Sequence, residues 1–147
     1  MDRSIRFHYN VSVSHRGMAR IGMIYYILFN ISLVTLGCFL PWLHPGLFVV
    51  GLKGYQMIDG KVILALALIG FSVAAFQLLQ RRGRFDWLYG LIGFAILMIT
   101  ALDLYTFYLN RYPIGPGIYL VALGGLQLTG AYLFLLFNRK KGTASSF

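Results

Sequence analysis

Residues 88–108 read LYGLIGFAILMITALDLYTFY, and this stretch decides the fold class. It is apolar almost throughout, and Asp103 is the one acidic or basic side chain within it. At ~1.5 Å per residue, an α-helix of this length covers the ~30 Å hydrocarbon core of a bilayer. Backbone polar groups find no water there, so the segment must satisfy them internally as a helix. The stretch therefore predicts a transmembrane helix.

Three further runs have the same character, and with the first they predict transmembrane helices at residues 21–40, 62–79, 88–108 and 117–137. The composition agrees, since 59% of the residues are hydrophobic and only 12% are charged, against about 25% charged in soluble domains. We therefore predict an all-α integral membrane protein whose transmembrane domain is a four-helix bundle (21–137). A cytoplasmic N-terminal arm (1–20) precedes it, and a basic cytoplasmic tail (138–147) follows.

The polar connections contain residues typical of helix ends. Pro41 is expected to end the first helix, because proline breaks the backbone hydrogen-bond ladder. Asp59 and Asp86 are expected to be the N-caps of the second and third helices. Pro116 suits the first turn of the fourth helix.

The basic residues predict the orientation. Most of the 13 lysines and arginines lie before residue 21, between the second and third runs, or after residue 138, whereas Lys53, Lys61 and Arg111 lie in the other two connections. The positive-inside rule then places both termini in the cytoplasm, and we predict the cytoplasmic membrane of a prokaryote. The net charge of +9 is spread between apolar runs without a separate basic domain, so no nucleic-acid partner is expected.

Aromatic side chains are expected to form a belt at each membrane surface, because their amphipathic rings favour headgroup depth. The outer belt would contain Trp42, Tyr55, Tyr108, Tyr112 and Tyr119, and the inner belt Phe85, Trp87 and Tyr89.

The longest connection, residues 41–60, has two β-prone runs, 48–50 and 55–58, around Gly51–Gly54. This pattern predicts a short β-hairpin over the outer helix ends.

The same connection carries a family resemblance. Leu40-Pro41-Trp42, then Gly54-Tyr55-Gln56, then Asp59-Gly60-Lys61 leading into the second helix, resembles many small uncharacterised four-helix membrane proteins of prokaryotes. The likeness covers about a third of the chain. It implies the four-helix architecture and carries no function with it.

The N-terminal arm alternates apolar and polar residues, a period that predicts a β-strand with one apolar face. A lone strand needs a partner surface, so we expect the arm to dock on another protein. An irregular arm lying along the membrane interface is the alternative. The residues of the candidate contact face are Ile5, Phe7, Tyr9, Val11 and Val13.

Close helix packing is predicted from small and polar residues, since lipid provides no hydrophobic drive for helices to associate. In the third helix a stripe at three- and four-residue spacing shares one face: Gly90, Gly93, Leu97, Thr100 and Asp103. Asn30 and Gln127 fall near mid-membrane, so a hydrogen bond between them is expected. The alternative is that each amide bonds its own helix backbone or a partner subunit.

The sequence shows no arrangement of residues typical of a membrane enzyme or electron carrier. The three histidines, His8, His15 and His44, lie outside the predicted helices, and Cys38 is the single cysteine. No carboxylate pair or metal-ligand cluster is recognisable. We therefore expect no catalytic residues, cofactor or metal, and no enzyme activity.

Asp103 is the exception, because an intramembrane carboxylate is a functional candidate by default. It falls near the outer end of its helix, so we expect a structural role in which the carboxylate reaches interfacial water, Arg111 or a tyrosine hydroxyl. Proton or ion handling, or contact with a partner subunit, are the alternatives. The absence of other chemistry favours an accessory or structural subunit of a larger membrane complex, in energy transduction or transport, with the lipid bilayer and other membrane subunits as partners. The alternative is a small transporter or channel in which the intramembrane polar residues line a path: Asp103, Thr100, Asn30 and Gln127.

Overall fold

The structure, a computed structural model, describes the backbone of residues 3–43, 51–80 and 85–144 and the side chains of residues 21–43, 51–79 and 85–137. The elements in chain order are α1 (Arg3–Phe39), β1 (Pro41–Leu43), β2 (Leu52–Lys53), the 3-10 helix η1 (Gly54–Gln56), α2 (Ile58–Gln80), α3 (Asp86–Leu109) and α4 (Pro116–Ala144). Within the described residues, four segments are long and apolar enough to cross a membrane: Ile21–Phe39, Ile58–Leu79, Asp86–Leu109 and Pro116–Phe137. The prediction of an all-α bundle with four such helices is confirmed.

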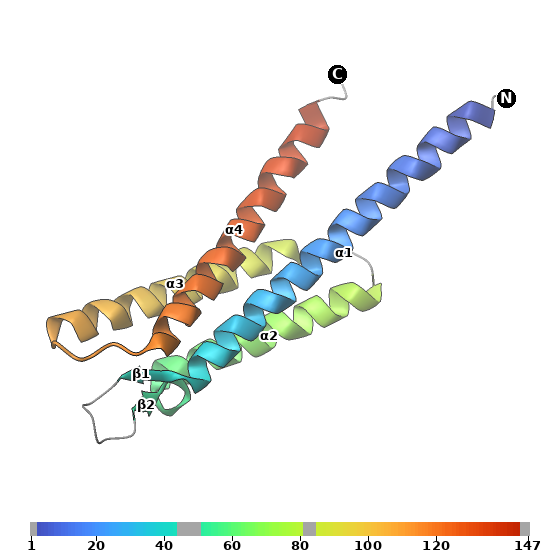
Figure 1. Cartoon of the computed structure of the whole chain (residues 1–147). Coiled ribbons are helices and arrows are strands. Elements are labelled where there is room, and N and C mark those ends of the chain that lie inside the picture. Colours follow the sequence, from blue (N-terminus) through green and yellow to red (C-terminus); the bar gives the residue numbers. More distant parts are fainter. Residues whose placement is uncertain (1–2, 44–50, 81–84, 145–147) are drawn as a thin grey trace.

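The helices form a bundle in which α4 packs extensively against both α1 and α3, while α2 packs against α1 and, over a smaller area, against α3. The first turns of α1 and the last turns of α4 lie at one end of the bundle, and β1 and β2 lie at the other (Figure 1). We call the end with β1 and β2 the loop end. Both chain ends therefore emerge on the same side.

Glycines bring the neighbouring helices into close contact. A Cβ on Gly37 of α1 would lie 2.8 Å from the carbonyl oxygen of Gly117 on α4. A Cβ on Gly93 of α3 would lie 2.8 Å from the backbone nitrogen of Thr129, also on α4. In lipid, such close backbone approach is a main source of attraction between helices. Four residues of the predicted stripe, Gly90, Gly93, Thr100 and Asp103, are buried, as expected for a packing face, whereas Leu97 is half-buried.

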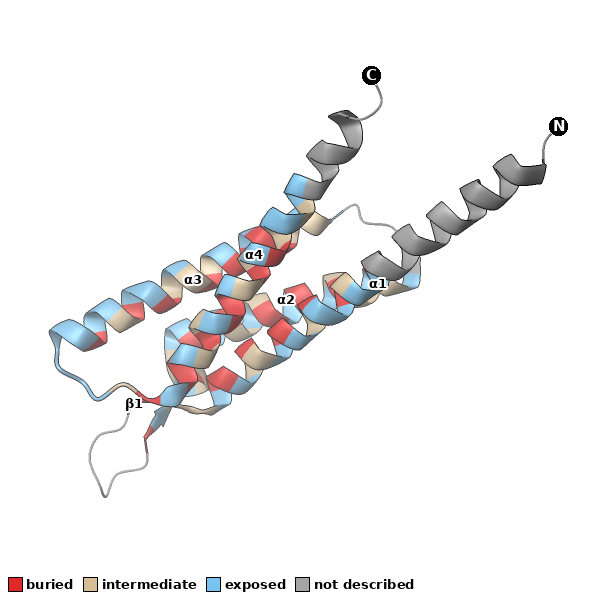
Figure 2. Cartoon of the chain, turned by 45° about the horizontal axis from the view of Figure 1, so that its top comes forward, coloured by how far each residue is buried: buried red, intermediate tan, exposed pale blue. Residues whose placement is uncertain are grey.

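Buried residues lie on the helix faces that are turned toward one another, and exposed residues lie on the outer faces (Figure 2). Many of the exposed residues are large and apolar. Leu68, Leu102 and Phe134 are each at least 60% exposed on different helices. In water such surfaces would promote aggregation, whereas hydrocarbon solvates them. This distribution suits a bundle surrounded by lipid.

Trp42 closes the loop end, and its predicted place in an interfacial aromatic belt is wrong. The side chain is fully buried, and its Nε1 donates a hydrogen bond to the carbonyl oxygen of Gly37 at 3.0 Å. The backbone nitrogen of Gly115 donates to the Trp42 carbonyl oxygen at 2.7 Å. The indole fits there because Gly54 lies against the ring, where any Cβ would collide with it.

The connection between α1 and α2 contains a small antiparallel pair of strands, as expected, but the strands are other residues. Leu52 and Lys53, which the sequence pattern places in the turn, form β2 and pair with β1. Tyr55 belongs to η1, and residues 48–50 lie outside the described residues. The ladder forms beside the end of α1, where Leu43 also makes an isolated bridge to Ile114 of the α3–α4 connection.

The N-terminal arm is helical, so both the strand prediction and its irregular alternative are wrong. Helix α1 begins at Arg3 and continues without a break into the apolar segment. Extending an existing helix requires no new nucleation. The alternation of apolar and polar residues in the arm is too weak a preference for a strand to stop this extension.

Two predicted helix starts also need correction. Helix α2 begins at Ile58 and α3 begins at Asp86, so Asp59 and Asp86 lie in the first turns and are not N-caps. Their charges still face the positive ends of the helix dipoles. Pro116 is the first residue of α4, as predicted.

Candidate functional site

Asp103 lies in the interior of the loop end, on the buried face of α3. The residue is only 8% exposed. Its Oδ2 is buried and has no hydrogen-bond partner. A carboxyl group in this position is costly unless a neighbour compensates it.

The side chain beside Asp103 is another carboxyl group, that of Asp59 in the first turn of α2. Helices α2 and α3 run antiparallel: Tyr89 bonds to Gln77 near their connection, and Gly70 lies against Ile92 further along. Following this register to the loop end brings the start of α2 alongside Asp103. There the side chains of Asp59 and Asp103 lie in hydrogen-bonding contact.

The contact overturns the expectation that no carboxylate pair exists. Asp59 is exposed whereas Asp103 is buried, so the pair runs from the surface into the bundle. The two residues are far apart in sequence, and the local pattern around Asp59 indicates only helix capping. One feature of the sequence could have indicated the contact. Two helices joined by a short connection, as α2 and α3 are, usually pack antiparallel, so the start of the first helix lies beside the end of the second.

Thr100 lies one turn before Asp103 on the same buried face of α3. It is 1% exposed, and its hydroxyl donates a hydrogen bond to the carbonyl oxygen of Ile96 at 2.6 Å. The threonine proton is therefore used within its own helix, and only the lone pairs of the oxygen remain for another group.

Asn30 and Gln127 do not form the predicted hydrogen bond. The Nδ2 of Asn30 donates to the carbonyl oxygen of Tyr26 at 2.8 Å, within α1. Asn30 Oδ1 and Gln127 Oε1 are both buried without a partner. The amide satisfies its donor locally because a backbone carbonyl one turn away is always within reach. The alternative of bonding to its own helix is correct for Asn30.

Gln127 lines a pocket of about 390 Å³ between α1 and α4. Gly130 borders the same pocket, and a Cβ there would meet no atom within 4 Å. Neither Asp103 nor Thr100 belongs to this pocket, so the four candidate polar residues do not gather in one cavity. The lining residues are Met23, Tyr26, Leu126, Gln127, Gly130, Ala131 and Phe134.

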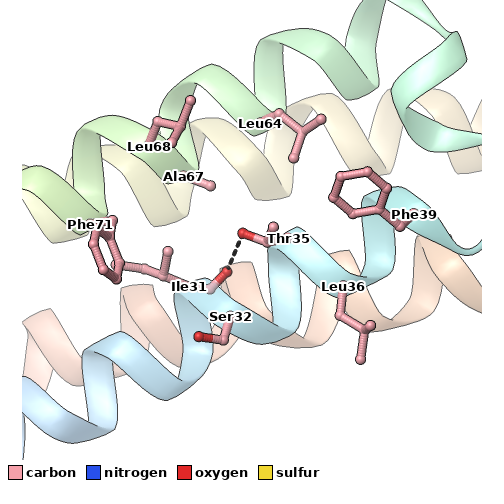
Figure 3. A pocket seen from close by; sticks show the side chains of 9 residues that line it. All are labelled: Ile31, Ser32, Thr35, Leu36, Phe39, Leu64, Ala67, Leu68 and Phe71. Carbon is pink, nitrogen blue, oxygen red and sulfur yellow. Dashed lines mark hydrogen bonds between the residues drawn. The ribbon is translucent and has the colours of Figure 1, made fainter.

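A larger groove, of about 690 Å³, lies between α1 and α2. Small residues, Ser32, Thr35 and Ala67, alternate with bulky apolar side chains along it (Figure 3). The two hydroxyls donate hydrogen bonds of 2.9 Å to carbonyl oxygens of α1, so the groove presents no free donor. Its other lining residues are Ile31, Leu36, Phe39, Leu64, Leu68 and Phe71.

Within the described side chains, no three of His, Cys, Asp and Glu come together to hold a metal ion. Cys38 is buried and free, so it is a small packing residue of α1. The side chains of the candidate arm, Ile5 to Val13, lie outside the described ones, and their role in partner contact stays a prediction.

Comparison with known proteins does not assign the chain to a family. No protein-family model, no curated protein and no solved structure matches the chain. The function must therefore be inferred from the site residues and surfaces.

Proposed function

We propose that this protein is an accessory or structural subunit of a larger membrane protein complex, without catalytic chemistry of its own. It would cross the cytoplasmic membrane of a prokaryote four times, with both termini in the cytoplasm. The basic residues flanking α1, α2, α3 and α4 support this orientation through the positive-inside rule. The chain ends on one side of the bundle are consistent with it (Figure 1).

The groove between α1 and α2 is the observation that carries the subunit proposal. It lies in the segments of both helices that are long and apolar enough to cross a membrane, is almost wholly apolar, and opens outward. Small residues in its lining permit close approach of another backbone, which is what transmembrane helices require for association. A transmembrane helix of a larger membrane protein is the occupant that we propose.

The chemistry of the groove also argues against a polar small molecule as occupant. Ser32 and Thr35 use their hydroxyl protons within α1. Ligand pockets usually combine apolar walls with a few polar groups that fix orientation, and such groups are missing from this lining. The affinity of the groove for its occupant would therefore come from packing between apolar surfaces of matched shape.

Isolation of the tagged chain from native membranes in a mild detergent tests the proposal. We expect larger membrane proteins to co-purify in fixed stoichiometry, identified by mass spectrometry. Recovery of the chain only as a monomer or homo-oligomer would overturn the subunit role.

A small transporter or channel is the second candidate, and the burial of Asp103 beside Asp59 favours it. Intramembrane carboxylates commonly mark ion or proton pathways. Thr100, Asn30 and Gln127 would have to extend the path from Asp103. An Asp103→Asn variant that leaves every measured flux unchanged would remove this candidate.

A further inference from the structure

We propose that Asp59 and Asp103 form a proton-binding carboxyl pair at the loop end, in which one proton is held between the two side chains and exchanges with water through Asp59. This site goes beyond the subunit role and does not depend on it.

Charge is the first reason. Two carboxylates in contact repel each other, and neither can be buried cheaply as an isolated anion. Within the described side chains, neither Asp59 nor Asp103 forms an ion pair. Among the described residues, the other charged groups of this end are Lys53, Lys61 and Arg111, and the Lys53 ammonium nitrogen lies 5.9 Å from the centre of the Tyr55 ring. A proton removes one of the two negative charges and turns repulsion into a strong O–H···O⁻ hydrogen bond.

The coordination is wrong for a metal ion. Ca²⁺ and Mg²⁺ require about six or more oxygen ligands, several of them waters or carbonyl groups. Here Asp103 Oδ2 is enclosed without a partner, and no third acidic residue, histidine or cysteine joins the pair among the described side chains. A proton needs only the two carboxyl groups that are present.

Different exposure gives the two residues different roles. Asp103 is 8% exposed, whereas Asp59 is open to solvent. The neutral form therefore belongs on Asp103 and the charge on Asp59, where the positive end of the α2 dipole also favours it.

Proton exchange follows this arrangement. A proton from water binds to Asp59, and the O–H bond of Asp59 breaks as one forms on Asp103. The negative charge thereby returns to the exposed carboxyl group, and release occurs by the reverse steps. Asp59 is thus the exchange group and Asp103 the buried holder.

Infrared spectroscopy tests the pair directly, because a protonated carboxyl group has a C=O stretch that a carboxylate lacks. The chain has only four Asp and Glu residues in total, so assignment is simple. The full chain is measured at neutral pH in an alkyl maltoside, a detergent without carbonyl groups. We expect a protonated-carboxyl band that disappears in Asp103→Asn and changes frequency in Asp59→Asn, where an amide replaces the carboxylate acceptor.

Asp2→Asn is the control, since it removes an aspartate that precedes α1 and should leave the band unchanged. Absence of the band in the native chain, or its persistence in Asp103→Asn, would overturn the proposal. If Asp103→Asn does not fold, the exposed Asp59→Asn variant decides the question, because an unshifted band there would exclude a shared proton.

Two further readouts distinguish an exchangeable proton from a sealed carboxyl group and from a bound metal ion. In D₂O the band should shift within minutes, because Asp59 gives access to water, and resistance over hours would contradict the proposed route. Millimolar Ca²⁺ or Mg²⁺ should leave the band in place, and its loss would show a metal site instead.

Discussion

The hydroxyl of Tyr89 donates a hydrogen bond to Oε1 of Gln77 across 3.2 Å and joins α3 to α2 inside the bundle. Gln77 in turn donates from Nε2 to Oδ1 of Asp86, also at 3.2 Å. Both Tyr89 and Gln77 are at most 2% exposed. These bonds fix the register of α2 on α3 near their connection, and the same register sets Asp59 against Asp103 at the loop end.

Tyr89→Phe should weaken the bundle, because the buried Oε1 of Gln77 loses its donor. Interhelical hydrogen bonds in membranes contribute roughly 0.6–2 kcal/mol, and we expect a loss of that size in the free energy of unfolding. Titration of the folded protein with a denaturing detergent measures it. Tyr105→Phe removes the same atom from an exposed position of α3 and should change stability by less than about 0.5 kcal/mol. Equal effects of the two substitutions would contradict a structural role for the Tyr89 hydroxyl.

Gly93→Ala should separate α3 from α4. The added methyl group would lie 2.8 Å from the backbone nitrogen of Thr129, a backbone atom that has little freedom to move. Overpacking of this kind typically costs about 1–3 kcal/mol. Gly130→Ala provides the control, because its Cβ meets no atom within 4 Å and alanine favours helix over glycine. The same unfolding titration should show Gly93→Ala less stable and Gly130→Ala equally or more stable. The reverse order would mean that α3 and α4 do not approach as described.

Ser32→Phe should reduce recovery of the partner by filling the groove between α1 and α2. Ser32 is exposed within the groove, so its replacement should spare the bundle itself. Ser72→Phe is a closely matched control: Ser72 is also exposed, makes the same 2.9 Å bond to a carbonyl oxygen four residues earlier, and does not line the groove. Quantitative mass spectrometry of the isolated complex should show a loss of tenfold or more for Ser32→Phe alone. Equal recovery with both variants would place the interface elsewhere.

The proposed orientation can be checked with single cysteines, because Cys38 is the only native thiol and is buried. In a Cys38→Ala background, Leu52→Cys should react with a membrane-impermeant thiol reagent added to intact cells, since Leu52 is 46% exposed at the loop end. Thr143→Cys, in the last turn of α4, should react only after permeabilisation. The opposite labelling pattern would reverse the topology.

The sequence pattern correctly predicted the four apolar helices but not the conformation of the N-terminal arm. Long apolar runs leave a chain in lipid no alternative to helix, so composition alone predicts them. Alternation in the arm is a local preference, and the adjoining helix overrides it by extending to Arg3. The strands were misplaced because their pairing depends on Pro41 and on Ile114, a residue from a distant connection.

For the candidate site, sequence pattern identified Asp103 but not its partner. The apolar surroundings of Asp103 were visible in the sequence, whereas contact with Asp59 depends on the register of α2 against α3. That register rests on Gln77 and Tyr89. The sequence pattern placed Tyr89 in the inner aromatic belt, whereas its side chain is buried against α2, and no pattern singled out Gln77. The predicted hydrogen bond between Asn30 and Gln127 does not form, because the prediction rested on equal depth in the membrane alone. Equal depth does not orient two side chains toward each other.

Photo-crosslinking in native membranes tests the central claim of a subunit role most directly. A photoreactive residue replaces Leu68, a groove residue that is 68% exposed, and in a control it replaces Leu102, which is 62% exposed on α3 outside the groove. We predict that irradiation joins the Leu68 position to one particular membrane protein and gives no such product from the Leu102 position. Adducts with lipid alone, or the same products from both positions, would contradict the proposal that a partner helix occupies the groove.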